Sequence, residues 1–168
     1  MNKILRPNPL LLFAVFAVLP LFPSIAAAQT SPLVGAWTLT AADVIKADGT
    51  RGQDYGPTPH GLAVFTPDGH CAVHVFRSDR LKFASNDKRN GTPEEYKDAS
   101  LGMSTHFGTC IVDTAKGTIT FKIDSASFPN WDGTTQVRRF TLNGDELSWR
   151  VPPRPDGSVP VSTFKRVR

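Results

Sequence analysis

The chain has 168 residues and a formal net charge of +4 at pH 7, and its hydrophobic content of 40% is that of a globular protein rather than a disordered one. Its basic residues are scattered among acidic ones with no run of five, which excludes the basic patch expected of a nucleic-acid-binding protein. The length suits a single domain with one core.

The N-terminal segment has the pattern of a signal peptide. Lys3 and Arg6 precede an apolar run of about 16 residues, and Ala26-Ala27-Ala28 provides small residues for cleavage. The run is short for a helix that spans a bilayer, although an uncleaved anchor is the alternative. We expect cleavage after Ala28, a periplasmic or secreted protein with no membrane insertion after cleavage, and one domain over residues 29–168. Loss of the two leader cations reduces the net charge to +2.

The rest of the chain consists of short apolar runs separated by turn dipeptides such as Asp48-Gly49 and Asn143-Gly144. This pattern predicts antiparallel hairpins, because such dipeptides tolerate the positive φ angles of tight turns. Apolar and polar residues alternate most clearly around Phe121. The expected strands lie at about 35–46, 61–66, 70–76, 105–113, 117–125, 135–142, 145–151 and 160–167. Periodicity alone allows either a barrel or a two-layer sandwich.

One helix interrupts the strands. Thr92-Pro93-Glu94-Glu95 combines an N-cap residue, a proline at the first helical position and a capping-box glutamate. It predicts a short helix over about 93–103, between the third and fourth expected strands. The polar stretch over residues 77–91 predicts a long loop before this helix, and we expect the loop to form a lid or rim near one mouth.

The two cysteines, Cys71 and Cys110, both lie in the segment expected to be exported. An oxidising compartment allows a disulfide between them, which would close a 39-residue loop and add roughly 4 kcal/mol of stability in the chain-entropy model. The alternative is a pair of buried thiols that behave as small hydrophobic residues.

No local motif of a hydrolase, a zinc protease or a phosphate-binding loop is present, so no catalytic residue and no cofactor are predicted. His70 and His74 share one strand face, and His106 begins the next expected strand, so three imidazoles are candidates for a zinc site. Solvent-facing or hydrogen-bonded histidines are the favoured interpretation, and we predict no metal.

Arg138 and Arg139 are adjacent on an expected strand, so one faces inward and the other outward. A buried guanidinium needs a carboxylate, a carbonyl or an anionic ligand group as its partner, and its forked donors suit a planar carboxylate. It is therefore a candidate to orient a polar ligand head, the alternatives being an internal salt bridge or a stack over Trp37. Gln136 faces the same side as Arg138.

Aromatic residues are numerous, and we expect most of them to form the core and some to line a cavity. Phe128 and Trp131 are the favoured ligand contacts because they lie in a turn, although they could also plug the barrel end. The predicted ligand-binding residues are Phe65, Phe76, Phe107, Phe121, Phe128, Trp131, Gln136, Arg138 and Trp149.

Three segments of the chain resemble the bacterial and fungal lipocalin-like domain family: Leu33 to Trp37, Gly91 to Tyr96 and Ser127 to Phe140. The resemblance implies an all-β fold, an eight-stranded antiparallel up-and-down barrel of the calycin type. It also implies that Trp37 closes one end beneath a basic residue of the last strand, here Arg166.

Two places depart from the family pattern. Cys110 and Ile111 stand where the family has an aromatic residue and then an acid, and Phe121 and Lys122 replace a histidine-bearing stretch. No particular ligand is therefore transferred from the family. We expect an exported protein that binds a small hydrophobic or amphipathic molecule in its barrel cavity. The alternatives are a cavity enzyme, an isomerase or cyclase that uses a histidine or Asp132 as acid or base, and an interaction module of the cell envelope.

Overall fold

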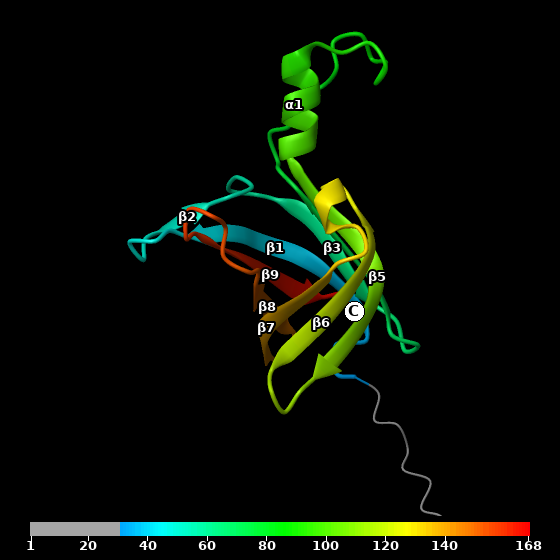
Figure 1. The fold of residues 1–168 in the computed structure, drawn as a ribbon, viewed down its shortest axis with the longest axis vertical. Coiled ribbons are helices and arrows are strands. Elements are labelled where there is room, and N and C mark those ends of the chain that lie inside the picture. The colour runs from blue at the N-terminus through cyan, green and yellow to red at the C-terminus, as the bar shows by residue number, and fades with distance from the viewer. Residues whose placement is uncertain (1–30) are drawn as a thin grey trace, which may run out of the picture.

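A single antiparallel sheet forms the body of the computed structural model, which describes residues 31–168 (Figure 1). The strand order is β2-β1-β3-β4-β5-β6-β7-β8-β9, and β1 also pairs with β9, so the sheet closes into a barrel. The strands are β1 (Gly35–Ile45), β2 (Arg51–Gln53), β3 (His60–Phe65), β4 (His70–Phe76), β5 (Met103–Asp113), β6 (Thr118–Ala126), β7 (Thr135–Asn143), β8 (Glu146–Arg150) and β9 (Val159–Arg166).

The closed sheet confirms the predicted all-β, eight-stranded antiparallel barrel. β2 is an addition to the eight expected strands, and it pairs only with the last three residues of β1, so it lies outside the closed wall. The pairing between β1 and β9 is what distinguishes this barrel from a sandwich, whose sheets keep open edges. The predicted leader over residues 1–28 lies outside the described residues.

The core follows from the two-residue period of the strands. On β6, Ile119, Phe121 and Ile123 are buried, whereas the intervening Lys122 and Asp124 are exposed. The buried side chains of the other strands converge on the same interior. Because the sheet closes on itself, these side chains cover one another and no second layer is needed over its apolar face.

Trp37 and Arg166 lie together at one end of the barrel, the arrangement that the resemblance implied. The Trp37 side chain is fully buried, and its indole Nε1–H donates to the Leu33 carbonyl at 2.8 Å. The guanidinium carbon of Arg166 lies 4.0 Å from the centroid of the Trp37 ring. Arg166 also donates to the carbonyls of Val34 and Pro32, at 3.0 Å and 2.7 Å. The last strand and the chain that precedes the first strand are thereby held together.

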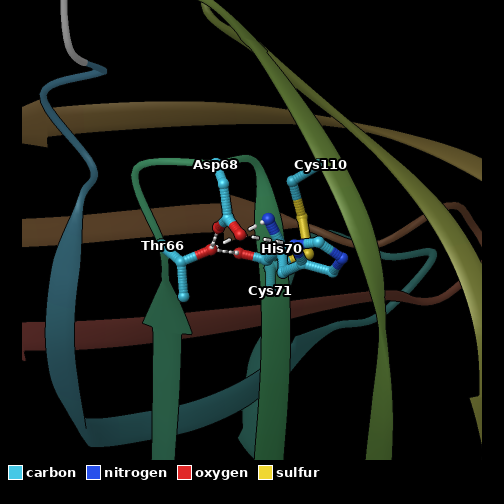
Figure 2. Close-up of a disulfide and its surroundings, with 5 residues drawn as sticks. All are labelled: Thr66, Asp68, His70, Cys71 and Cys110. Carbon is cyan, nitrogen blue, oxygen red and sulfur yellow. Dashed lines mark hydrogen bonds and ion pairs between the residues drawn. A yellow bond between two sulfur atoms is a disulfide. The ribbon is translucent and has the colours of Figure 1, made fainter.

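Cys71 on β4 and Cys110 on β5 form a disulfide, with their Cα atoms 6.0 Å apart (Figure 2). The turn between β3 and β4 lies directly beside it. There the Cys110 backbone N–H donates to the Gly69 carbonyl at 2.7 Å. Nδ1 of His70 is 3.2 Å from the Asp68 carboxylate (Figure 2). The disulfide and these polar contacts together fix the turn to β5.

The helix α1 (Pro93–Leu101) lies between β4 and β5, as predicted, and extends beyond the ends of these strands (Figure 1). Arg77 forms ion pairs with Asp79 and Asp98, and the Leu81 backbone N–H donates to the Asp98 carboxylate at 2.7 Å. The segment before the helix is therefore tied to the helix itself. Within the described chain, no helix is long and apolar enough to cross a bilayer.

Candidate ligand-binding site

A cavity of about 420 Å³ lies at the end of the barrel opposite to Trp37. The pairing of β1 with β9 shows this placement: Trp37 pairs with Arg166 at one end of β1, and Val44 pairs with Pro160 at the other. Pro160 lines the cavity. The volume falls in the range of about 300–1,000 Å³ that is typical of small-molecule sites.

Four strands and three irregular segments form the wall of this cavity. Because alternate residues of a strand face inward, each strand contributes residues two positions apart. The strand residues are Val73 and Val75 on β4, Ser104 and His106 on β5, Gln136 and Arg138 on β7, and Pro160 and Ser162 on β9. The irregular segments contribute Asp54 and Tyr55 after β2, Phe128 and Trp131 around the 3-10 helix η1 (Pro129–Trp131), and residues 151–155 after β8.

The composition of this wall is mostly apolar, with polar groups at a few positions. Valine, proline and aromatic side chains make up most of it. Prolines 152, 153 and 155 lie in the segment after β8, and their fixed φ angles restrict the conformations of that part of the mouth. An apolar hollow with a few polar groups is the usual form of a site that orients an amphipathic molecule.

Arg138 is the inward-facing member of the arginine pair on β7. Its side chain is 3% exposed, whereas the neighbouring Arg139 is exposed. Its Nη2 donates to the Gln136 side-chain oxygen at 2.8 Å, and its guanidinium carbon lies 4.5 Å from the centroid of the Phe121 ring. Its Nε has no hydrogen-bond partner among the described residues. Burial lowers the pKa of Arg138 to about 9, so the side chain is still charged at neutral pH.

His106 is the second polar side chain buried in the wall. Its ring packs edge-on against Phe121 and Trp131, with centroid distances of 5.1 Å and 6.4 Å. Neither of its ring nitrogens has a hydrogen-bond partner among residues 31–168. Burial lowers the pKa of His106 to about 3, and the positive charge of Arg138 adds to this effect. The imidazole is therefore neutral at pH 7, with one N–H donor and one acceptor nitrogen.

The other charged groups of the wall neutralise one another. Nη1 of Arg154 donates to the Asp54 carboxylate at 3.0 Å, and Nη2 donates to the second oxygen of the same carboxylate. Tyr55 lies beside this pair, and burial raises the pKa of its hydroxyl, so it is uncharged at pH 7. Arg138 therefore provides the unbalanced positive charge of the cavity.

Four of the predicted ligand-binding residues line the cavity: Phe128, Trp131, Gln136 and Arg138. Phe128 and Trp131 pack edge-on, with ring centroids 5.8 Å apart. Phe128 is 51% exposed, so it lies at the mouth and does not seal it. The structure thus brings together the turn and the strand that the sequence singled out.

The other five predicted residues do not line the cavity. Phe65, Phe121 and Trp149 are buried in the core, where the Phe121 and Trp149 rings lie 5.9 Å apart. Phe107 is 54% exposed because it follows the inward-facing His106 and so points outward. Phe76 shares the outward face of β4, where it stacks with His74. The expectation that Phe76 and Phe107 face the cavity is thus corrected by the parity of their strands.

The three histidines do not converge. His70 and His74 lie on the outer face of β4, whereas His106 pairs with the inward-facing Val73 from β5. Within the described part of the chain, no group of three or more histidine, cysteine, aspartate or glutamate side chains is arranged to hold a metal ion. The imidazole of His106 faces inward and is part of the cavity wall.

Several wall residues were absent from the sequence-based set. Val73 and Val75 alternate with His70 and His74, so the alternation that identified β4 also carried the signal for these valines. The prolines at 152, 153 and 155 are visible in the sequence as a break after a strand. Tyr55 offered no local signal, because only the closure of the barrel brings the segment after β2 to the mouth.

Comparison with known proteins adds the following findings. A family model described as a lipocalin-like domain matches residues 34–167, a range that includes every strand of the barrel. Among solved structures, the chain resembles a lipocalin-like protein from Bacteroides uniformis ATCC 8492, at 16% sequence identity and a TM-score of 0.42. That alignment covers 80% of this chain and 98% of the other. No curated protein matches the chain.

Proposed function

Because the chain belongs to the lipocalin-like domain family, we propose that it binds a small hydrophobic or amphipathic molecule in the cavity of its barrel. The observation that carries this proposal is the apolar hollow of about 420 Å³ at one end of a barrel whose other end is closed by Trp37 and Arg166. A hollow of this kind gains binding energy from every apolar ligand atom removed from water.

The sizes of the inward-facing side chains account for the hollow. The large side chains of Phe121, Trp149 and Phe164 fill the core beside the cavity and are almost fully buried. Around the cavity itself, inward positions carry smaller residues such as Val75 and Ser162. A barrel of eight strands has room for either packed side chains or one small ligand, so smaller side chains leave space for a ligand.

The proposal is tested on protein purified from its host by native mass spectrometry, which detects a retained compound. Tryptophan fluorescence against a panel of lipophilic compounds provides a second readout, because Trp131 lies in the wall. We expect a saturable change in the wild type and its loss in Ser104→Phe, whose added ring fills the cavity. Phe107→Ala, on the outer wall, is the matched control and should bind as the wild type does. If the wild type retains no compound and shows no saturable change, the proposal is wrong.

The site of action that we propose is the periplasm or the extracellular space, after removal of residues 1–28. The signal-like N-terminal pattern and the disulfide between Cys71 and Cys110 support this proposal, because disulfides persist in oxidising compartments. Cell fractionation combined with the intact mass of the product tests it. A product that keeps residues 1–28 and stays in the cytoplasm would contradict it.

A cavity enzyme is the second candidate, and the buried imidazole of His106 is the observation that favours it. Asp132, the other acid–base candidate, is exposed, and its carboxylate accepts the Ala126 backbone N–H at 2.7 Å. It therefore stabilises the turn between β6 and β7. A pKa of His106 near 3 makes it a weak base, so its neutral N–H is the group able to polarise a ligand carbonyl. Conversion of a bound compound by the wild type and not by His106→Phe would establish this candidate. Recovery of every bound compound unchanged would reject it.

A further inference from the structure

We propose that the ligand carries a single carboxylate, which Arg138 binds at the inner end of the cavity while the apolar body of the ligand extends toward the mouth. This inference rests on the proposed function, and it adds the chemical class of the ligand and its orientation in the site.

Arg138 carries a buried guanidinium that is not fully hydrogen-bonded. Arg138 is 3% exposed, its one side-chain hydrogen bond goes to the neutral Gln136, and its Nε has no partner within residues 31–168. The face of the Phe121 ring contributes a weak attraction for the charge. A buried cation without an anion is costly, and an anionic ligand group would remove that cost.

The described part of the cavity wall has no free anion to pair with this cation. Among the described residues that line the cavity, Asp54 carries the one carboxylate, and both of its oxygens accept hydrogen bonds from Arg154. No ion pair of Arg138 is present in the described chain. The cavity therefore has one positive charge in excess, located at its inner end.

The charge and shape of the guanidinium determine which anion fits. A single guanidinium balances a single negative charge, and its planar fork matches the two oxygens of a carboxylate. The neighbouring donors are neutral: the Gln136 amide N–H groups and one N–H of His106. A phosphate monoester, with nearly two negative charges at pH 7, would leave one of them unbalanced in an apolar enclosure. The wall thus fits a monocarboxylate.

The orientation follows from the direction of β7. This strand begins beside η1 at the mouth, and Arg138 lies two residues further along the strand than Gln136. Phe128, the residue before η1, lines the cavity and is half exposed, so it lies at the mouth. Apolar side chains such as Val75 and Trp131 line the space between the guanidinium and the mouth. A ligand that enters with its carboxylate first places its apolar body against them.

The experiment compares two probes that share a chain and differ in the head group, dodecanoate and dodecanol, in fluorescence titrations below their aggregation concentrations. We expect wild-type protein to bind dodecanoate about tenfold more tightly than dodecanol, or better, as for a hydrogen-bonded charge. Arg138→Met should lose that preference while its affinity for dodecanol stays the same. Arg139→Met removes the adjacent outward charge and should behave as the wild type.

The outcomes separate this inference from the proposed function. If the wild type binds both probes with equal affinity, or if Arg138→Met keeps the preference, the inference is wrong and the proposed function stands. If the wild type binds neither probe, and no other lipophilic compound, both are wrong. If Arg138→Met does not fold, Arg138→Lys replaces it. Lysine keeps the charge but lacks the fork, so a several-fold weaker preference for dodecanoate is expected and an unchanged preference contradicts the inference.

Discussion

The side chains of His106 and Arg138 face the cavity as polar groups in apolar surroundings. The unpaired nitrogens of both residues are buried, and the pKa of each is lowered mainly by removal from water. Such positions lower the stability of the empty protein, because unsatisfied buried polar groups are destabilising. Their location on a cavity wall is what makes them available to a bound molecule.

At this scale, the neutral state of His106 predicts a pH dependence of stability. Between pH 6.5 and about 3, the unfolded chain binds a proton at His106 and the folded chain does not, so acid favours unfolding in this window. We expect the wild type to lose about 2 kcal/mol more than His106→Leu between pH 7 and pH 5. Urea unfolding at several pH values measures the difference.

Two neighbouring groups, Arg138 and His74, also lower the pKa of His106. Arg138, on β7, stays charged throughout the window, and His74, on β4, also contributes to the lowered pKa of His106. His74→Gln is the control, and it should retain most of the wild-type pH dependence. Equal pH dependence in the wild type and His106→Leu would show that His106 titrates normally.

At the scale of elements, α1 is a separate unit attached to the barrel. Thr92 caps it: its hydroxyl accepts the Glu95 backbone N–H at 3.2 Å, and the Glu95 carboxylate accepts the Thr92 backbone N–H at 2.7 Å. The same carboxylate accepts the Ala84 backbone N–H at 2.8 Å, so the cap also holds the preceding loop. The described residues that line the cavity include none from α1 and none from the loop over residues 77–91, so the loop does not form the expected lid or rim of this cavity.

The capping box predicts a local effect of Thr92→Ala. Loss of an N-cap hydroxyl costs about 1 kcal/mol, which should raise the hydrogen-exchange rates of residues 93–101. Fluorescence titration of the same variant should give wild-type ligand affinity, because the helix lies outside the cavity wall. Ser100→Ala, near the exposed end of the helix, is the control. A large loss of affinity in Thr92→Ala would show that α1 belongs to the site.

The strands and the helix were predictable because each has a local cause. Gly144 and Asp145 form the tight turn between β7 and β8, one position later than the Asn143-Gly144 pair, and Gly144 has the positive φ of 58° that such a turn needs. Alternation identified the barrel strands, and the capping box identified α1 to within two residues of its end. β2 was missed because three residues are too few to show a period, and η1 was treated as a turn without regular structure.

At the scale of the whole molecule, the barrel is closed by contacts between residues far apart in the chain. β1 pairs with β9, Arg166 covers Trp37, and the disulfide links Cys71 to Cys110 across 39 residues. Of these, the disulfide acts on the unfolded chain as well, because it restricts the conformations available to the unfolded state.

This crosslink predicts a global change in stability. We expect Cys71→Ser/Cys110→Ser to lower the free energy of unfolding by roughly 4 kcal/mol, the value for a loop of this length in the chain-entropy model. Urea unfolding of the wild type in the presence and absence of a reductant measures this difference. The double variant is the control, since it has no disulfide and the reductant should not change its unfolding. An unchanged wild-type midpoint under full reduction would contradict this expectation.

The sequence alone determined the eight strands of the barrel wall, the all-β class, and that one of two adjacent arginines faces inward. These features follow from local periodicity, turn chemistry and capping, all of which act over a few residues. Only the tertiary structure decided that Arg138 is the inward one, that Phe107 points outward, and that His106 and Tyr55 join the wall. Those outcomes depend on strand register and on closure of the sheet, which bring together side chains that no local pattern relates.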